Sequence, residues 1–325
     1  MQLLFALAAV IVVTNWTKLW LVQAELAPKA VRVFGTPLPR AELPRSLPEA
    51  SDTTLRWMVL GDWGTGGIIQ RQVAQSMVLM ARRAPVHFIL STGDNIYPAG
   101  VRSADDPQWV SKFERIYADS TLRVPWYPVL GNHDYQGMPE AQVAYGKQNP
   151  LWYMPARYYS VVRYLHDSTP VLFVALDTQE LLATSGAGRQ RQMKWIERTL
   201  EDFPGVWKLV WGHHPLRSAG AYGENRELLR LLKPIFDRHG VVAYFCGHEH
   251  DLQLLKHPDD RFVCIVSGAG GGVRSTAYGP HSLFATAQPG FVYAALGKQS
   301  LYLWFITVGG VPQYVAEVLQ PRREP

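Results

Sequence analysis

HFILSTGDNIY, residues 87–97, is the stretch that best predicts the fold of this 325-residue chain. Its first half is a short apolar run typical of a buried strand, and a glycine followed directly by Asp94 comes after it. Four further apolar runs end in the same way, with a glycine and then a side chain that can bind a metal ion. Glycine permits the tight turn that directs the next side chain into a crevice, and in sheets with helical crossovers ligands gather at strand ends. We therefore expect five strand ends to meet at one site, at VLGD (59–62), LSTGD (90–94), VLGN (129–132), VWGH (210–213) and YFCGH (244–248).

Apolar runs of strand length recur along the chain and alternate with amphipathic helical patterns. The strand-like runs are residues 57–60, 87–90, 126–130, 171–176, 206–211, 241–246, 262–266, 291–296 and 301–308. The helical patterns cover residues 69–81, 189–203 and 224–233. This alternation favours an α/β fold, and the consecutive strands after residue 240 indicate that part of the sheet system is antiparallel. We predict a sandwich of two mixed β-sheets with helices on the outside.

The segment Gly247-His248-Glu249-His250 is the most specific of these strand ends. In an extended chain, side chains two residues apart point to the same face, so His248 and His250 would present two imidazoles side by side. Such a pair suits two metal ions about 3.5–4 Å apart, the separation found in hydrolytic two-metal sites. A structural histidine pair is the alternative, just as a single Gly-Asp after a strand is more often a turn or a helix cap. The combination of five such ends favours a metal site.

In chain order, the motifs GDWG (61–64), GDNIY (93–97), GNHD (131–134), GHHP (212–215) and GHEH (247–250) resemble those of the calcineurin-like metallophosphoesterases. They are most similar to the small purple acid phosphatases of tartrate-resistant type, over a region from about Arg56 to beyond Val266. The resemblance implies the fold of that superfamily, a four-layer α-β-β-α sandwich of two mixed β-sheets flanked by helices. It also implies an acid phosphatase that hydrolyses phosphate monoesters by metal-bound hydroxide at a dinuclear Fe(III)–M(II) centre.

The same resemblance assigns seven residues of this chain to two metal ions. It implies that site 1 holds Fe(III) between Asp62, Asp94, Tyr97 and His250. It implies that site 2 holds Fe(II), Zn or Mn between Asp94, Asn132, His213 and His248. Asp94 would then bridge the two ions.

Tyr97 distinguishes the purple acid phosphatases from other metallophosphoesterases. A phenol with an ordinary pKa of about 10 becomes a ligand at low pH only beside a highly charged cation, because such a cation favours the phenolate. Ferric iron supplies that charge, and charge transfer from phenolate to iron would give the purple colour. The alternative is another dinuclear metallophosphoesterase, a phosphodiesterase or nucleotidase that uses Mn or Zn.

Two further histidines are candidate catalytic residues, since the leaving alcohol needs a proton donor or electrostatic help. His133 follows Asn132, where the family places a histidine facing the substrate, and His214 follows His213. His133 could instead bond Asp134 or a backbone carbonyl, and His214 could simply line the rim. The chain also departs from the animal enzymes, because Tyr222 in SAGAYGEN stands about where those enzymes have a second histidine. The general acid and the pH optimum therefore stay open at this point.

The composition is that of a folded protein with a mixed surface. Hydrophobic residues make up 47% of the chain, and the formal net charge is +5 with an isoelectric point of about 9.1. Lysines and arginines are scattered, so a nucleic-acid groove is not favoured, whereas a mild positive field suits small anions. We expect small phosphomonoesters or phosphoproteins as substrates, no nucleic-acid partner and a monomeric protein. Only Cys246 and Cys264 could form a disulfide, and we expect buried free thiols with a single bridge as the alternative.

The N-terminal region has the pattern of an export signal. Residues 3–13 form an apolar run of the length of a signal-peptide core, and Val22-Gln23-Ala24 is a small-residue cleavage site. An uncleaved anchor over residues 3–22 is the alternative, because apolar residues resume at Leu19. We therefore predict a signal peptide or signal anchor (1–24), a proline-rich linker (25–50) and a catalytic domain (51–325). The protein is expected to be secreted, lysosome-like or anchored on the lumenal or extracellular side of a membrane.

Overall fold

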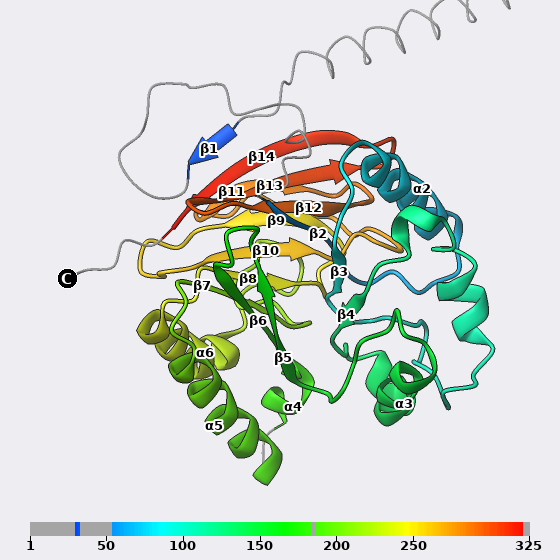
Figure 1. Cartoon of the computed structure of the whole chain (residues 1–325), viewed down its shortest axis with the longest axis horizontal. Coiled ribbons are helices and arrows are strands. Elements are labelled where there is room, and N and C mark those ends of the chain that lie inside the picture. The colour runs from blue at the N-terminus through cyan, green and yellow to red at the C-terminus, as the bar shows by residue number, and fades with distance from the viewer. Residues whose placement is uncertain (1–29, 33–53, 184–185, 321–325) are drawn as a thin grey trace, which may run out of the picture.

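Two mixed β-sheets lie face to face in the computed structural model, which describes residues 30–32, 54–183 and 186–320 (Figure 1). Among these residues the first sheet has seven strands, in the order β1 (Ala30–Arg32), β14 (Val311–Leu319), β13 (Ser300–Thr307), β12 (Gly290–Leu296), β2 (Leu55–Leu60), β3 (Phe88–Ser91) and β4 (Trp126–Pro128). The second has seven as well, in the order β11 (Ser282–Thr286), β9 (Leu252–Leu255), β10 (Val263–Ser267), β8 (Ala243–Cys246), β7 (Trp207–Trp211), β6 (Pro170–Ala175) and β5 (Tyr159–Tyr164).

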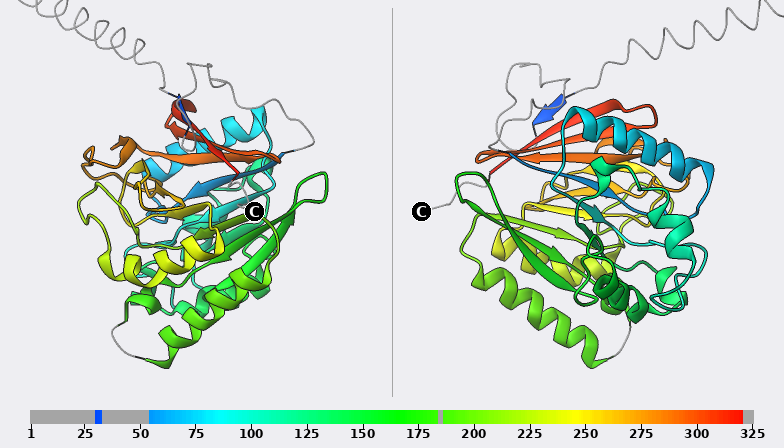
Figure 2. Two further views of the ribbon diagram at one scale, coloured as in Figure 1. Left: turned by 90° about the vertical axis from the view of Figure 1, so that its left-hand side faces the viewer. Right: turned by 45° about the vertical axis from the view of Figure 1, so that its right-hand side comes forward.

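Helices cover the outer faces of both sheets (Figures 1 and 2). α2 (Ile68–Arg83) packs against the first sheet through a stripe of buried residues that includes Val73, Met77 and Met80. The second sheet is covered by α4 (Thr178–Leu182), α5 (Ala187–Asp202) and α6 (Arg226–His239). α3 (Pro139–Gln148) follows the loop after β4. The predicted four-layer α-β-β-α sandwich is confirmed.

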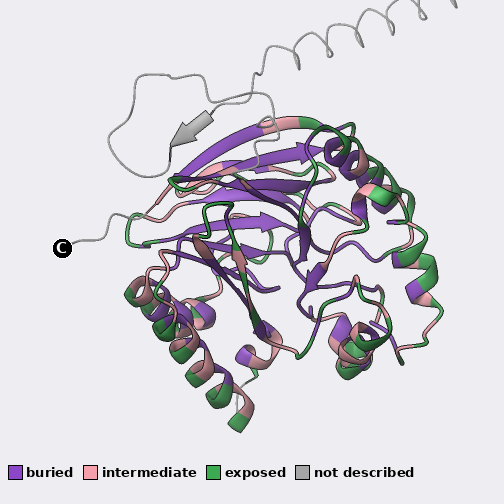
Figure 3. Ribbon diagram, in the orientation of Figure 1, coloured by how far each residue is buried: buried purple, intermediate pink, exposed green. Residues whose placement is uncertain are grey.

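Aromatic side chains from both sheets form the centre of the core. Trp57 of β2 stacks on Phe88 of β3 at a centroid distance of 5.6 Å, and it meets Phe173 and Phe245 of the second sheet edge-on at 5.3 and 6.3 Å. Buried residues run along the strands of both sheets, whereas the outer faces of the helices are exposed (Figure 3). The apolar strands therefore stabilise the molecule by excluding water from the space between the sheets.

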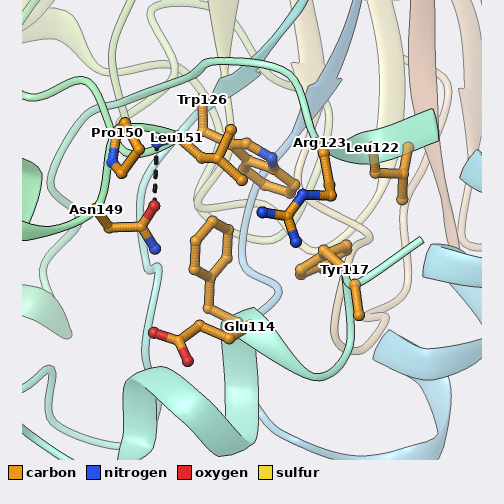
Figure 4. Close-up of a pocket in the computed structure, with 10 residues that line it drawn as sticks. Glu114, Tyr117, Leu122, Arg123, Trp126, Asn149, Pro150 and Leu151 are labelled. Atoms are coloured by element: carbon orange, nitrogen blue, oxygen red, sulfur yellow. Dashed lines mark hydrogen bonds between the residues drawn. The ribbon is translucent and has the colours of Figure 1, made fainter. Parts of the chain in front are cut away.

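A second aromatic cluster lies beside β4 and lines a cavity of about 290 Å³. Trp126, Tyr117 and Phe113 form its wall, while the side chains of Glu114 and Arg123 reach toward it from different sides (Figure 4). None of the seven predicted metal ligands lines this cavity. It is thus separate from the predicted site.

Several strands were not predicted from the sequence. β5 alternates buried and partly exposed residues, and β9, β11 and β14 carry polar side chains within their runs. α6 continues past Pro234, beyond the predicted end at residue 233, because Ile235 and Phe236 extend its buried face. Three residues of the segment predicted to be a linker form β1, which pairs with β14 in parallel. The predicted leader, residues 1–24, lies outside the described residues, and among the described helices none is long and apolar enough to cross a membrane.

Parallel pairing determines where the site can form. β2 pairs with β3, β3 with β4, and β7 with β8, each in parallel. The carboxyl ends of parallel neighbours lie at the same edge of a sheet, so the loops that follow these five strands are brought together. Cys246 and Cys264, on the neighbouring strands β8 and β10, are buried and free.

Candidate metal centre

The first sheet presents oxygen donors. Asp62 follows β2, Asp94 follows β3 and Asn132 follows β4. Both aspartates have left-handed backbone, with φ of 57° and 49°, a conformation that is uncommon outside glycine and often found at functional sites. Both carboxylates are almost fully buried. Among the described residues, left-handed backbone outside glycine also occurs at His248 and Ser168, so three of these four residues are predicted metal ligands.

Glycine is required where the loop after β4 passes the Asp94 carboxylate. A Cβ atom added to Gly131 would lie 2.1 Å from Oδ1 of Asp94, and one added to Gly247 would lie 2.3 Å from Oδ2 of Asp62. Both positions precede a predicted ligand, Asn132 and His248 respectively. Close approach to a carboxylate thus explains the glycine in these two of the five motifs.

The second sheet presents imidazoles. The Nδ1 atom of His213 lies 2.9 Å from the carbonyl oxygen of Thr92, and since a carbonyl only accepts, Nδ1 carries the proton and Nε2 is left with a lone pair. That Nε2 lies 3.1 Å from Oδ1 of Asn132 and 3.2 Å from Nδ1 of His248. Donor atoms of three of the four residues predicted for site 2 thus face one another.

Tyr97 is the centre of the other group. Its Oη lies 2.8 Å from Oδ2 of Asp94, 3.1 Å from Oδ1 of Asp62 and 3.2 Å from Nε2 of His250. Asp94 reaches both groups, because its Oδ1 lies 3.6 Å from Nε2 of His213. The structure therefore brings all seven predicted residues together, in two groups that share Asp94.

Burial controls the electrostatics of these residues in the absence of a cation. Burial and the charge of Asp94 raise the pKa of Asp62 well above its usual value. Burial lowers the pKa of His248 to about 3 and that of His250 to about 4, and it also lowers that of His213. The imidazoles are consequently neutral and offer lone pairs, while the adjacent buried carboxylates of Asp62 and Asp94 form no ion pair with a lysine or arginine among the described residues.

The phenol of Tyr97 lies among the buried carboxylates, which control its charge state. Burial and the charges of Asp62 and Asp94 raise its pKa far above the usual value. A multivalent cation between the same carboxylates would reverse this effect, since it neutralises them and favours the phenolate. Carboxylates, an amide oxygen, a phenol and neutral imidazoles are a donor set that fits iron and zinc.

Comparison with known proteins identifies the family. The family model of the calcineurin-like phosphoesterases matches residues 55–252. Tartrate-resistant acid phosphatase type 5 of Oryctolagus cuniculus is 35% identical over 244 residues, which cover 68% of this chain and 74% of the relative. Purple acid phosphatase 4 of Arabidopsis thaliana is 31% identical over 281 residues, which cover 80% of this chain and 82% of the relative. The chain belongs to the purple acid phosphatases.

Solved structures support the same fold. The anchor protein GAP50 of the inner membrane complex of Plasmodium superposes with a TM-score of 0.75 at 22% identity, over 84% of this chain and 90% of that one. A purple acid phosphatase from yellow lupin (Lupinus luteus) seeds gives 0.65 at 14% identity, over 84% of this chain and 55% of that one. As a purple acid phosphatase, the chain is a metal-dependent hydrolase of phosphate monoesters.

The two candidate catalytic histidines lie in different surroundings. The Nδ1 atom of His133 lies 2.5 Å from the carbonyl oxygen of Pro98, and its Nε2 lies 4.0 Å from Oδ2 of Asp94. His214 is buried rather than on the rim, and its Nδ1 lies 2.8 Å from Oγ1 of Thr178. Burial and the neighbouring imidazoles hold the pKa of His214 well below its usual value. His214 also lies close enough to His213 and His248 for the three rings to hold one metal ion.

Asp134, predicted only as a possible hydrogen-bond partner of His133, supports the site from behind. Its carboxylate accepts hydrogen bonds from the backbone N–H groups of Gly131 (2.9 Å), Asn95 and Ile96. Burial and the charge of Asp94 raise its pKa to about 7. Asp134 thus holds the loops after β3 and β4 in register, while His133 bonds a backbone carbonyl instead.

The glycine-rich segment after β10 packs behind the site as a turn. The N–H of Gly268 donates to the Asp251 carbonyl, and that of Gly270 donates to the Gly61 carbonyl. These two amides are therefore already bonded and do not face a substrate. The segment leads to Arg274, a residue near the metal ligands that the sequence patterns gave no reason to select.

Proposed function

We propose that the chain is an acid phosphatase that hydrolyses phosphate monoesters at a centre of two metal ions. In this proposal Fe(III) is held by Asp62, Asp94, Tyr97 and His250, and Fe(II), Zn or Mn by Asp94, Asn132, His213 and His248. The observation that carries the proposal is the position of Tyr97, whose Oη lies within 3.2 Å of donor atoms from Asp62, Asp94 and His250. A neutral phenol can donate only one proton to these acceptors, whereas a cation among them would favour the phenolate as a ligand.

The metal ions, when bound, would supply an activated water and positive charge for the phosphoryl oxygens. The residues of the chain contribute orientation and proton transfer. Asp94 receives the backbone N–H of His133 at 2.9 Å, which fixes the His133 ring at the edge of the site. With its Nδ1 proton donated to Pro98, His133 directs Nε2 toward the site, where it can hold a proton for the leaving alcohol. His214, held by Thr178, orients the rings of His213 and His248.

We infer that the substrates are small phosphomonoesters or phosphoproteins and that the protein acts as a monomer without nucleic acid. Expected locations are the extracellular space, a lysosome-like compartment, or a membrane to which residues 3–22 attach the chain. Gel filtration of the purified protein would test the monomeric state, and N-terminal sequencing of the protein from its native host would test the location. A stable dimer would contradict the monomeric state, and a native N-terminus at Met1 in a protein that is not attached to a membrane would contradict the expected location.

The decisive experiment for the metal centre combines metal analysis with a visible absorption spectrum, for the wild type and for Tyr97→Phe. We expect two metal equivalents including iron, and a broad visible band that disappears when the phenol oxygen is removed. Tyr293→Phe is the matched control, because its hydroxyl donates only to the Ala84 carbonyl at 3.0 Å within the core. That variant should keep both the band and the activity.

Other outcomes would change the assignment. Two metal equivalents without a visible band would favour a phosphodiesterase or nucleotidase that uses Mn or Zn. A wild-type protein that binds no metal would overturn the proposed function.

A further inference from the structure

Arg274 places a positive charge between the two histidines of the GHEH segment. Its backbone N–H donates to the His250 carbonyl at 2.9 Å, which attaches the loop after the glycine-rich segment to the site. In the side chain, Nη2 lies 3.2 Å from Nε2 of His250, and Nη1 donates to the His248 carbonyl at 3.5 Å. The guanidinium is partly buried. It therefore lies beside residues predicted for both metal sites.

No carboxylate of the described residues lies within ion-pair distance of this cation, although its charge also acts on the buried carboxyl of Asp62. Among the described residues, Arg274 forms no ion pair, in contrast to Arg217, which lies 2.9 Å from Asp260 and 3.0 Å from Glu224. A partly buried guanidinium without a counter-ion is uncommon, because desolvation of a charge is costly unless a partner compensates it. The partner is thus expected to be an anion that enters the site.

A dedicated loop supports Arg274. Its Cζ lies 5.2 Å from the ring centroid of Tyr222, and that ring stacks on His248 at 4.3 Å. Glu249 holds the loop in place, since its buried carboxylate accepts the N–H groups of Tyr222 (2.6 Å) and Ala221 (3.1 Å). One segment, residues 248–250, thus carries two predicted metal ligands and the anchor of the loop that supports the arginine.

We propose that Arg274 binds the phosphoryl oxygens of the substrate, with Tyr222 and Glu249 as positioning residues. This inference rests on the proposed function. A planar guanidinium donates two parallel hydrogen bonds to phosphate and keeps its charge throughout the acidic range. A metal ion at Nε2 of His250 would compete with Nη2 for the same lone pair, so in the metal-loaded protein Nη2 is free to bind an anion.

The inference defines a substrate class. A phosphate monoester carries a terminal phosphoryl group with up to two negative charges, whereas a phosphodiester carries one and has an alcohol on both sides. A fixed guanidinium at the rim favours the terminal, dianionic group. Arg274 would therefore select monoesters over diesters and would retain inorganic phosphate, the product, as an inhibitor.

The test uses the metal-loaded full-length protein and the variants Arg274→Gln and Arg274→Lys. We expect Arg274→Gln to raise the Kd for inorganic phosphate, measured by calorimetry, and the KM for a monoester by about 10- to 100-fold, the usual loss for a charged hydrogen-bond partner. Turnover of bis(p-nitrophenyl) phosphate should change less than threefold. Arg274→Lys keeps the charge without the planar fork, so its values should lie between those of the wild type and Arg274→Gln.

Controls separate binding from structure. Arg230→Gln makes the same chemical change on the exposed face of α6, where Glu227 is the ion-pair partner of the side chain among the described residues, and it should leave all values unchanged. Tyr222→Ala removes the ring that supports Arg274 and should raise KM more than it lowers kcat, whereas Tyr222→Phe keeps the ring and should raise KM less than Tyr222→Ala does.

Three outcomes would overturn the inference. One is an unchanged phosphate Kd in Arg274→Gln with full metal content. Another is an equal loss of monoester and diester turnover, and the third is loss of metal in both arginine variants, which would make Arg274 structural. A wild-type protein without metal or phosphatase activity would instead disprove the proposed function itself.

Discussion

The two sheets contribute different chemistry to one site. The loops after β2, β3 and β4 supply oxygen donors, from Asp62, Asp94, Tyr97 and Asn132, whereas the loops after β7 and β8 supply nitrogen donors, from His213, His248 and His250. Neither sheet alone gathers a mixed set of ligands. The site therefore depends on how the two sheets pack together, and a bound cation would join them.

Hydrogen bonds already connect the two halves. The N–H of His248 donates to Oδ2 of Asp62 at 2.9 Å, and the ring of His213 bonds the Thr92 carbonyl at the same distance. The electrostatics of the halves are opposite, because burial disfavours the anion of Asp62 and equally disfavours the cations of His248 and His250. A multivalent cation satisfies both halves at once.

The largest effect is expected from Asp94, the residue that reaches both groups. Asp94→Asn keeps the shape and removes the charge, so we expect loss of both metal ions and a fall in kcat/KM of about 10⁴-fold or more. His213→Gln removes a donor of one group only and should leave one metal equivalent. Metal analysis of both variants measures the difference. Asp202→Asn, at the exposed end of α5, is the control.

The reverse pattern of metal retention would contradict these roles of the two sheets. One metal retained in Asp94→Asn, with none in His213→Gln, would mean that the imidazole half binds the ions and that Asp94 does not bridge them.

The two candidate catalytic histidines allow the sheets to be tested separately, since one histidine comes from each sheet. His133 has an exposed fraction of 29% and directs Nε2 toward the site, whereas His214 is buried with its Nδ1 bonded to Thr178. We expect His133→Asn to lower kcat about 100-fold for alkyl phosphates, which need a proton on the leaving alcohol, and much less for p-nitrophenyl phosphate. His214→Asn should lower kcat by about 10-fold for both, through the orientation of neighbouring rings.

This dependence on the leaving group identifies the acid. An equal loss for both substrates in His133→Asn would exclude it as the proton donor. If the selective loss occurred in His214→Asn, the acid would belong to the second sheet.

The sequence predicted the parts of the fold and of the site that depend on local pattern. Fully buried strands such as β8 and β12 are continuous apolar runs, and each of the five motifs pairs a glycine with a ligand. β14 was missed because Glu317 interrupts its pattern. The structure shows that this glutamate is buried and accepts hydrogen bonds from Ser300 (2.7 Å) and Tyr302 (3.0 Å) of the neighbouring strand. Such compensation cannot be seen from the sequence alone.

The supporting residues of the site were missed for a related reason. Arg274 meets Tyr222 and His250 only through the fold, and Glu249 bonds a loop that precedes it by some 27 residues. An arginine after a glycine-rich turn and a glutamate between two histidines are each compatible with an ordinary exposed side chain. The metal ligands had a repeated signature, whereas these residues act through single contacts between distant segments.

The smallest expected effect concerns stability, and it tests the opposite electrostatics of the two halves in metal-free protein. Unfolded histidines take up protons below a pH of about 6.5, whereas the lowered pKa values, about 4 for His250 and about 3 for His248, keep them neutral in the fold. The nitrogen half therefore loses stability as the pH falls from about 6.5 toward 4. Asp62 and Asp134 have raised pKa values, about 7 for Asp134, so the fold binds protons that the unfolded chain has released. The oxygen half loses stability as the pH rises from about 4 to 7.

Both losses of stability, the one on acidification and the one as the pH rises toward 7, should be present in the chelated protein and weak in the metal-loaded protein. Bound cations favour ionised carboxylates and neutral imidazoles alike. We expect metal to raise the unfolding temperature by at least about 5 °C at both pH 4.5 and pH 7.5, measured by calorimetry. In chelated protein, Asp134→Asn should reduce the loss of stability between pH 4 and 7 without changing the loss on acidification. If chelation shifted the whole pH profile uniformly, the two halves would not differ in their electrostatics, and metal would stabilise the protein only by joining the sheets.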